Sequence, residues 1–221
     1  MFNNIAPKYD LLNHLLSAGI DKGWRRKVRR ALAGDRPAII LDVATGTGDL
    51  AIELAKMPVE KIVGIDIAED MLKIAEKKAA RKGLSHIIAL EPGDAENIRY
   101  PDNHFDAITV AFGVRNYENL EKGLREMCRV LKPGKKVAIL EFSKPASFPM
   151  KNLYQFYFNH ILPTIGRMVS KDPEAYTYLP QSVAAFPEKD AFMKVLEKAG
   201  FKNPTQKRLT FGIATLYLAE K

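Results

Sequence analysis

The 221-residue sequence has little of the chemistry that disulfides and metal sites need. It contains one cysteine, Cys128, which excludes an internal disulfide and any zinc site built from cysteines. Cys128 lies in the apolar-periodic segment 124–131, which favours a small core residue over a nucleophile. None of the four histidines has a partner at the spacing of metal ligands, so we expect no metal site.

Long hydrophobic runs are also absent. No stretch of 18 apolar residues occurs, and this argues against a membrane-spanning helix. The first residues, Met1–Ile5, have neither the charged nor the apolar region of a secretory signal. We therefore expect a cytoplasmic location.

Positive charge is in excess, with a formal net charge of +8, and this favours an anionic partner or surface. Six basic residues lie within Lys22–Arg30, where Trp24, Val28 and Leu32 recur at helical spacing. The pattern predicts an amphipathic basic helix. Three interpretations of its charged face are open: a solvated surface, a contact with a membrane surface, or a contact with nucleic acid.

From Ala38 onward, short apolar runs alternate with helical patterns. The predicted strands are 38–43, 61–66, 87–90, 105–111 and 136–142, with predicted helices at 49–57, 68–82 and 120–131. This alternation predicts a parallel sheet with helices on both faces.

The alternation breaks after Phe142. The aromatic-rich segment 148–179 is expected to form helices over one end of the sheet, and 187–199 to form another helix. Strands at 207–211 and 213–219, joined at Gly212, are expected to form an antiparallel hairpin. The fold class is therefore α/β and Rossmann-like, with a mostly parallel seven-stranded sheet, helices on both faces and a C-terminal antiparallel hairpin.

A glycine loop follows the first predicted strand, from Asp42 to Asp49. Gly46 and Gly48 permit a tight turn and leave room for a ligand at the strand end. Asp66 ends the second strand, where its carboxylate could accept both hydroxyls of a ribose, and Asp94 follows the third. All these positions fall at carboxyl ends of strands, where open α/β sheets bind ligands.

The loop also satisfies the dinucleotide fingerprint, because Ala51 follows Gly48 at the required spacing. Asp42 argues against a dinucleotide, since a carboxylate there would repel a pyrophosphate and attract a cationic group. The four carboxylates expected at this rim, those of Asp42, Asp49, Asp66 and Asp94, favour a cationic nucleoside.

These motifs, together with Leu131-Lys132-Pro133-Gly134, resemble those of class I methyltransferases. The resemblance implies S-adenosyl-L-methionine as cofactor and S-adenosyl-L-homocysteine as product. The expected cofactor-binding residues are Asp42, Gly46, Thr47, Gly48, Asp66, Asp94, Ala95 and Ala111. On this division, 1–37 form an N-terminal helical cap and 38–142 the cofactor-binding core of a single domain. Residues 143–186 would form a helical substrate cap, and 187–221 the C-terminal helix and hairpin.

The methyl acceptor must be inferred from residues outside the shared motifs. After the fourth strand stands Phe112-Gly113-Val114-Arg115-Asn116, not the Asn/Asp-Pro-Pro-aromatic sequence of base amino-methyltransferases. The chain is similar over nearly its whole length to the ubiquinone/menaquinone biosynthesis C-methyltransferases. The similarity is carried by Phe2-x-x-Ile5-Ala6-x-x-Tyr9-Asp10, Trp24-Arg25, Phe112–Asn116, Leu140-Glu141-Phe142-Ser143, Pro163-x-x-Gly166 and Tyr176-x-Tyr178-Leu179.

This second resemblance implies methylation of a ring carbon of a polyprenylated quinol. Demethylmenaquinol to menaquinol is the favoured reaction, and the 2-polyprenyl-6-methoxy-1,4-benzoquinol step of ubiquinone synthesis is the second. The ring carbon becomes nucleophilic when an adjacent hydroxyl loses its proton. We expect Arg115 to stabilise the resulting phenolate, Asn116 to orient a hydroxyl or water, and Asp49 to act as a water-linked base. The expected substrate-binding residues are Tyr9, Phe112, Arg115, Tyr157 and Tyr178.

The aromatic segment 148–179 could provide a groove for the isoprenoid tail, with Phe156, Phe158, Ile161, Leu162 and Met168 along it, or simply a helical cap over the core. With the basic helix, it suggests that quinol is taken from an anionic membrane at the inner face. Nucleic acid is not expected as a partner, and a homodimer is a further option. The rival functions are a methyltransferase acting on a sterol or other small lipid, and a non-catalytic membrane- or nucleic-acid-binding module on a Rossmann core.

Overall fold

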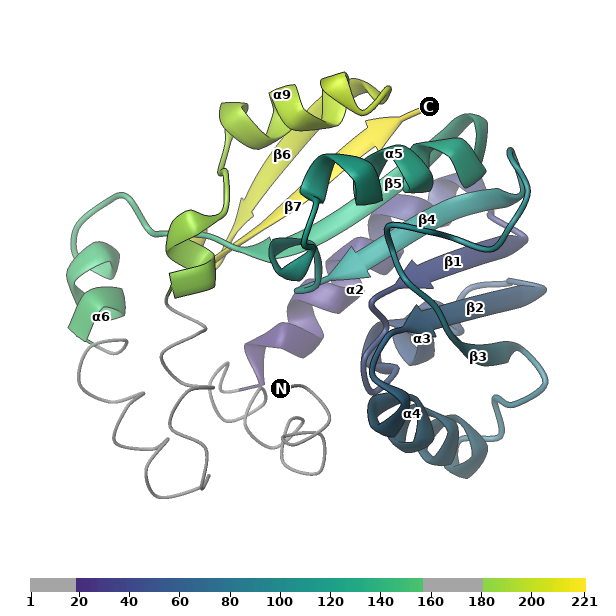
Figure 1. The fold of residues 1–221 in the computed structure, drawn as a ribbon. Coiled ribbons are helices and arrows are strands. Elements are labelled where there is room, and N and C mark those ends of the chain that lie inside the picture. The colour runs from purple at the N-terminus through teal and green to yellow at the C-terminus, as the bar shows by residue number, and fades with distance from the viewer. Residues whose placement is uncertain (1–18, 157–180) are drawn as a thin grey trace.

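The computed structural model describes residues 19–156 and 181–221, which build a seven-stranded sheet in the order β3-β2-β1-β4-β5-β7-β6 (Figure 1). The strands are β1 (Ile39–Val43), β2 (Lys61–Asp66), β3 (Ile88–Pro92), β4 (Phe105–Ala111), β5 (Leu131–Phe142), β6 (Lys202–Leu209) and β7 (Ala214–Glu220). Neighbours from β3 to β5 pair in parallel, whereas β7 is antiparallel to both β5 and β6. The predicted fold class is confirmed.

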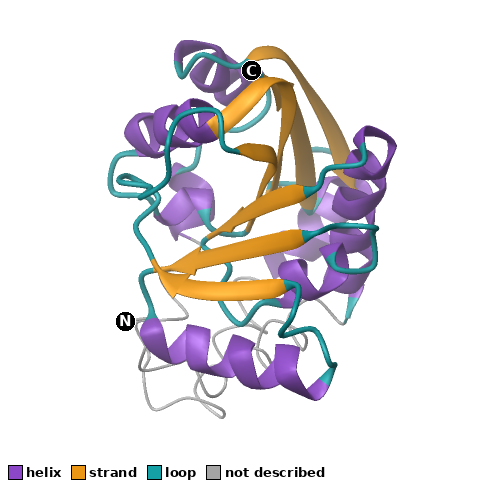
Figure 2. Ribbon diagram, turned by 90° about the vertical axis from the view of Figure 1, so that its right-hand side faces the viewer, coloured by secondary structure: helices purple, strands orange, loops and turns teal. Residues whose placement is uncertain are grey.

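Helices cover both faces of the sheet (Figure 2). The helices are α2 (Ile20–Leu32), α3 (Asp49–Leu54), α4 (Glu69–Arg81), α5 (Leu120–Val130), α6 (Met150–Phe156) and α9 (Asp190–Lys198). One apolar cluster joins the sheet to α2, α3 and α4, and a second joins it to α5 and α9. The parallel strands are buried on both faces, which explains their nearly continuous apolar sequences.

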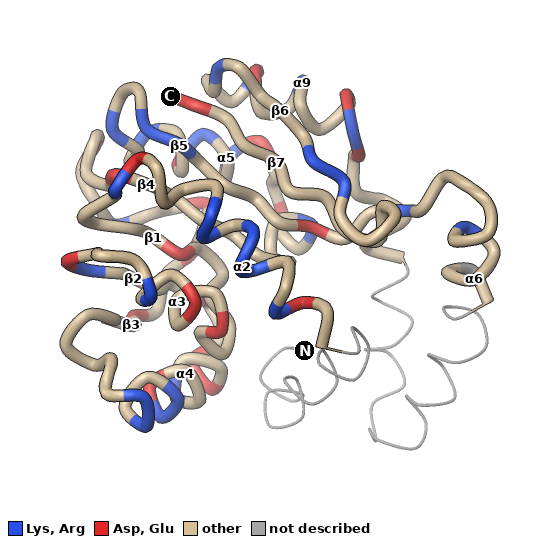
Figure 3. Tube along the Cα trace, turned by 180° about the vertical axis from the view of Figure 1, so that it is seen from behind, with Lys and Arg blue, Asp and Glu red and all other residues tan. Residues whose placement is uncertain are grey.

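Helix α2 confirms the predicted amphipathic helix. Trp24, Val28 and Leu32 are buried, whereas four of the six basic residues of the helix are exposed. Figure 3 marks the positions of Lys and Arg along α2 in blue. Arg25 is an exception, because it lies on the buried side of the helix with Asp21.

The predicted C-terminal antiparallel hairpin is present, but its strands have different bounds. β6 begins at Lys202 rather than at 207, and its turn is a short 3₁₀ segment, Thr210–Gly212. β6 is the edge strand of the sheet and most of its residues are exposed or half-buried, so it lacks an apolar repeat. Pro204 is tolerated there because the strand is at the edge. The sequence pattern was therefore too polar to predict the first half of β6.

Other boundaries differ from the prediction as well; the helix expected at 49–57, for example, ends at Leu54. The helix expected from 187 begins at Asp190, and the strand expected from 136 begins at Leu131 and contains Pro133 and Gly134. Tyr9, Tyr157, Tyr178 and four of the expected tail-groove residues, Phe158, Ile161, Leu162 and Met168, lie outside the described residues. Within the described ranges, no helix has the length and apolar character needed to cross a bilayer.

Core packing predicts a large difference between two leucines. Leu124 on α5 is fully buried, whereas Leu153 on α6 is 59% exposed. We expect Leu124→Ala to lower the free energy of unfolding by about 2–5 kcal/mol, because a cavity is left among packed side chains. Urea unfolding measures the loss, and Leu153→Ala is the matched control with a change under about 1 kcal/mol. Equal losses for the two variants would contradict this description of the core.

Candidate cofactor and substrate site

A cavity of about 320 Å³ lies at the carboxyl edge of the parallel strands. Its volume lies in the range of about 300–1,000 Å³ typical of small-molecule sites. The loops after β1, β2, β3 and β4 supply its walls. The lining includes Ala44, Gly46, Asp66, Ile67, Ala68, Met71, Gly93, Asp94, Ala95, Glu96, Ala111, Phe112, Gly113, Asn116, Tyr117 and Glu118.

The glycine loop is fixed by hydrogen bonds to the end of β2. The Gly46 amide donates to Asp66 Oδ2 at 2.8 Å, and the Thr45 amide donates to the Ile65 carbonyl at 3.0 Å. Gly48 adopts a φ of +79°, and a Cβ there would lie 3.0 Å from Cβ of Ala75 on α4. The loop therefore needs glycine at 48 for both its conformation and its close approach to α4.

Asp66 ends β2 and lines the cavity. Its Oδ1 accepts a hydrogen bond from the Ala68 amide and its Oδ2 from the Gly46 amide, both at 2.8 Å. Burial raises the pKa of its carboxyl group above the ordinary value. A carboxylate has about four acceptor positions, so capacity remains for hydroxyl groups of a ligand in the cavity.

Asp94, Ala95 and Ala111 also line the cavity, as predicted. Asp94 is exposed, and its Oδ1 accepts a hydrogen bond from the Glu96 amide at 2.8 Å. Gly93 lies against β2, where a Cβ would be 3.0 Å from Cβ of Ile65. The absence of a side chain at 93 allows the third loop to close against the second.

Asp42 does not line this cavity. It is 1% exposed and accepts hydrogen bonds from the hydroxyls of Thr45 and Thr109, both at 2.6 Å. Burial raises its pKa to about 6. The expectation of four carboxylates at one rim was therefore wrong in its geometry: Asp66 and Asp94 line the cavity, and Asp42 lies beneath the glycine loop.

A smaller hollow of about 40 Å³ adjoins the cavity on the other side of the glycine loop. Asp42, Thr47 and Asp49 line it, together with Arg25 from α2. Asp49 forms ion pairs with Lys78 and, at 3.5 Å, with Arg25, and Thr47 accepts a hydrogen bond from Lys78 at 3.2 Å. Asp49 and Thr47 are thus beside the predicted cofactor pocket, within a network of charged groups.

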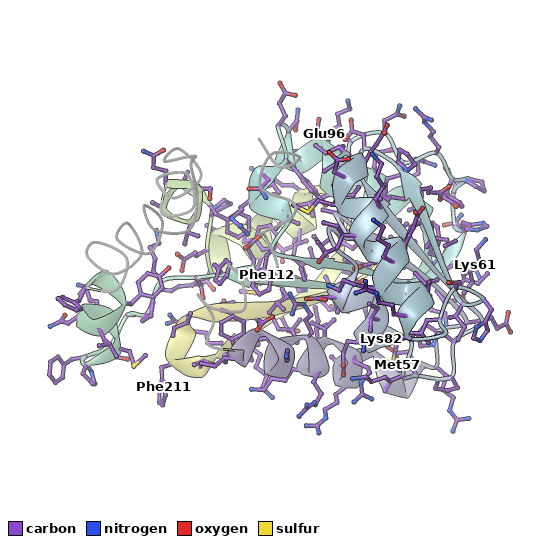
Figure 4. The ribbon with its side chains drawn as sticks, turned by 90° about the horizontal axis from the view of Figure 1, so that it is seen from below. Met57, Lys61, Lys82, Glu96, Phe112 and Phe211 are labelled. Atoms are coloured by element: carbon purple, nitrogen blue, oxygen red, sulfur yellow. The ribbon has the colours of Figure 1, made fainter. Side chains whose placement is uncertain are left out.

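The loop after β4 contains the short 3₁₀ segment Val114–Asn116. Arg115 donates from Nη1 to Glu141 at 2.7 Å and to the Phe112 carbonyl at 2.5 Å, and its side chain is 6% exposed. Its Cζ lies 5.3 Å from the ring centroid of Phe142. The ring of Phe112, labelled in Figure 4, stacks on Phe142 with centroids 4.4 Å apart.

Arg115 faces a second, more apolar hollow of about 400 Å³. This hollow lies between the loop after β4, the start of α5 and residues 181–187, and it is lined by Val114, Arg115, Tyr117, Leu120, Gln181, Ser182, Ala185, Phe186 and Pro187. Tyr117 lines both this hollow and the main cavity. Arg115 therefore lines the apolar hollow, whereas its neighbour Asn116 lines the main cavity.

Several lining residues were not predicted from the sequence. The main cavity is also lined by Ile67, Met71, Tyr117 and Glu118. A further residue that was not predicted is Glu141, which accepts a hydrogen bond from Arg115. A signal for Glu141 existed, because a fully buried carboxylate in an apolar strand requires a cationic partner. The position of Ile67 directly after Asp66 was also informative, since residues next to a strand end share its edge of the sheet.

Solved structures with the same architecture define the class of protein. A SAM-dependent methyltransferase from Aquifex aeolicus matches with a TM-score of 0.56 and 25% identity, over 82% of this chain and 81% of that chain. The cyclase SpnF matches with a TM-score of 0.73 and 19% identity, over 100% and 94%. The fold is that of the class I S-adenosylmethionine-dependent methyltransferases. Because a cyclase shares it, the fold alone does not determine the reaction.

Sequence comparison then gives the family. The model of the ubiE/COQ5 methyltransferase family matches residues 1–221. A demethylmenaquinone methyltransferase of Bacteroides fragilis is 49% identical over 222 residues, which is 100% of this chain and 91% of the relative. The ubiquinone/menaquinone biosynthesis C-methyltransferase UbiE of Geobacter sulfurreducens is 45% identical over 223 residues, with 100% and 87% covered. The chain belongs to the ubiE/COQ5 methyltransferase family, which confirms the resemblance found in its motifs.

The residues of the cavity fit S-adenosylmethionine. Asp66 offers acceptors for ribose hydroxyls, and Ile67, Met71 and Ala95 offer apolar contacts for a base. Gly46 and Gly93 also line the cavity, and Gly46 adopts a φ of +56°. Among the described residues, no group of three or more His, Cys, Asp or Glu side chains is placed to hold a metal ion.

The first prediction from this site concerns Asp66. We expect Asp66→Asn to raise the Kd for S-adenosylhomocysteine about 10–100-fold, because one charged acceptor is lost and an amide N–H faces a backbone donor. Isothermal titration calorimetry measures the change. Asp70→Asn, at a partly exposed position that pairs with Lys73 on the same helix, is the control and should leave the Kd unchanged. An unchanged Kd for Asp66→Asn would remove Asp66 from the binding site.

The second prediction concerns the pH dependence of stability. Since the pKa of Asp42 rises from 3.8 to about 6 on folding, the native state binds more protons than the unfolded state between these values. The free energy of unfolding should therefore fall as pH rises through this window, by up to about 3 kcal/mol from this group. Urea unfolding at pH 4 and pH 7 should show that Asp42→Asn gains stability relative to the wild type at the higher pH. Parallel pH profiles for the two proteins would contradict this assignment.

Proposed function

We propose that the protein transfers the methyl group of S-adenosylmethionine to a ring carbon of a polyprenylated quinol, converting demethylmenaquinol to menaquinol. Family membership over the full chain supports methyl transfer. The relatives from Bacteroides fragilis, Deinococcus radiodurans and Chlorobaculum tepidum, at 48–49% identity, carry the name demethylmenaquinone methyltransferase. These names favour a naphthoquinol over a benzoquinol.

The observation that carries the proposal is the position of the loop after β4. This loop lines the cofactor cavity with Phe112 and Asn116 and the apolar hollow with Val114 and Arg115, and Tyr117 contributes to both. A flat ring beside Phe112 and Tyr117 would meet the cofactor at one side, and its apolar tail would leave through the hollow. A loop with an arginine, an asparagine and two aromatic rings suits a quinol better than a charged acceptor.

The chemistry assigns separate tasks to these residues. Bound S-adenosylmethionine supplies a methyl group on a sulfonium sulfur. A quinol hydroxyl loses its proton, the adjacent ring carbon forms a bond to the methyl carbon while the carbon–sulfur bond breaks, and the ring carbon then loses its own hydrogen as a proton.

In this proposal Arg115 stabilises the phenolate. Its Nη1 is occupied by Glu141 and Phe112, but its buried Nε has no hydrogen-bond partner among the described residues and remains as a donor. A fixed cation beside a developing anion in an apolar hollow is an effective stabiliser. Asn116 would orient a hydroxyl or water from the cavity side. Asp49 remains a predicted water-linked base. Its ion pairs with Arg25 and Lys78 favour a structural role for it as well.

The proposal includes a peripheral contact with an anionic membrane from the cytoplasmic side. Lys22, Arg26, Lys27 and Arg30 are exposed on α2, which supports attraction to anionic headgroups (Figure 3). Phe148 and Phe211 are 83% and 75% exposed and could enter the headgroup region. The proposed membrane contact would bring the enzyme to its lipid substrate.

The test of the reaction is direct. The protein is incubated with methyl-labelled S-adenosylmethionine and a short-tail demethylmenaquinol under reducing conditions, and ring-methylated product is measured by mass spectrometry. A 6-methoxy-1,4-benzoquinol and a sterol are the comparison substrates. Methylation of the sterol alone, or of none of these compounds, would overturn the proposal.

Arg115 gives the sharpest prediction of this mechanism. We expect Arg115→Ala to lower kcat at least about 100-fold while the Kd for S-adenosylhomocysteine changes less than about threefold, because the cation acts on the phenolate and not on the cofactor. Arg115→Lys keeps a charge beside Glu141 and should retain more activity; it also serves if the alanine variant does not fold. Full activity of either Arg115→Ala or a correctly folded Arg115→Met would show that the assigned role is wrong.

A further inference from the structure

Arg25 is the unusual member of the basic cluster on α2. Lys22, Arg26, Lys27 and Arg30 are exposed, whereas the Arg25 side chain is 10% exposed and points toward the strand ends. Burial of a guanidinium is costly unless anionic groups offset it. Here Arg25 pairs with Asp21 and with Asp49, in both cases through Nη1. Its Nε and Nη2 groups make no hydrogen bond with the described residues and remain as donors.

The hollow that Arg25 lines adjoins the cofactor cavity. Ala44, Gly46, Ala111 and Phe112 line both spaces. At about 40 Å³ the hollow is too small for a nucleoside but suits a small polar group, since about 10–15 Å³ of such volume is enough for one water. It is therefore a side pocket at the glycine-loop end of the cavity.

The charges around this side pocket have both signs. Arg25 provides a cation, while Asp42 and Asp49 provide carboxylates. The field of Arg25 acts on Asp42, because it lowers the pKa that burial raises. A group that carries one positive and one negative charge would match such walls, whereas a purely anionic or cationic group would not.

We propose that Arg25 binds the α-carboxylate of the methionine moiety of S-adenosylmethionine. The inference rests on the proposed cofactor. Asp66 and Asp94 lie at the nucleoside end of the main cavity, and the amino-acid end would extend past Gly46 into the side pocket, where its carboxylate meets the free N–H groups of Arg25. On this proposal, α2 contacts the cofactor directly through Arg25, in addition to covering the sheet.

A purely structural role makes a different prediction. If Arg25 only joins α2 to the glycine loop through Asp49, its loss would distort the whole site and weaken every ligand of the cavity equally. If it binds the carboxylate, its loss would weaken only ligands that carry an amino-acid moiety. S-adenosylhomocysteine carries that moiety, and 5′-deoxy-5′-methylthioadenosine has the same nucleoside without it.

The experiment measures the Kd of both ligands by isothermal titration calorimetry for the full chain and three variants. Arg25→Gln should raise the Kd for S-adenosylhomocysteine about 10–100-fold and change that for methylthioadenosine less than about twofold, the loss expected for a charge-assisted hydrogen bond. Arg25→Lys should lie between, because it keeps the charge without the planar fork. Arg29→Gln is the matched control: Arg29 lies one turn further along α2 and pairs with Glu53 away from the side pocket, so both Kd values should be unchanged.

The outcomes separate the hypotheses. Equal weakening of both ligands by Arg25→Gln, or no weakening of either, would overturn the role of Arg25 and leave the cofactor assignment intact. Failure of the wild-type protein to bind S-adenosylhomocysteine would overturn the proposed function and this inference together. If Arg25→Gln does not fold, Arg25→Lys decides, with a loss of about 3–10-fold expected for S-adenosylhomocysteine alone.

Discussion

The hydrogen bond from the Gly46 amide to the Asp66 carboxylate joins the loops that follow β1 and β2. Parallel strands bring their carboxyl ends to one edge of the sheet, but the loops there would stay separate without such a connection. Asp66 also accepts from Ala68 at the start of the next helix, so one carboxylate fixes the glycine loop, the end of β2 and the entry to α4. The cavity is the space enclosed by loops that are held in this way.

A second constraint acts on the other side of the cavity. A Cβ at Gly113 would lie 2.6 Å from Cβ of Ala44, so the loop after β4 can approach the glycine loop only without a side chain there. The Arg115–Glu141 ion pair then holds this loop on β5. The SpnF comparison shows why these details matter, since the same fold supports a cyclase. The reaction depends on what the strand-end loops carry.

The sequence allowed the architecture and much of the cofactor site to be predicted, because both depend on local patterns. The parallel strands could be identified from short apolar runs, because strands that are buried on both faces have nearly continuous apolar sequences. Asp66, Asp94, Ala95 and Gly46, which the sequence analysis expected to bind a cofactor, all line the cavity, since residues that follow parallel strands lie at one edge of the sheet. β6 was underestimated because an edge strand needs no apolar repeat.

Features that depend on contacts between distant segments were not predictable. Asp42 looked like a rim carboxylate, but the Thr109 hydroxyl from β4 and the covering glycine loop place it inside the protein. The partner of Arg115 is 26 residues away on β5, and no local pattern connects them. Arg25 belonged to a cluster that looked uniformly solvent-facing, and only the packing of α2 on the sheet separates it from its neighbours.

The position of β7 in the sheet has a consequence for the biosynthesis of the protein. β7 is the last described strand in the chain, yet it pairs with β5 along residues 136–142, including Glu141. Until β7 has been synthesised and has paired, β5 is an open edge and the support of Arg115 is unfinished. A domain generally folds as a unit. A nascent chain that lacks β7 therefore has an incomplete sheet beside Glu141, and the support of Arg115 is among the last parts of the site to form.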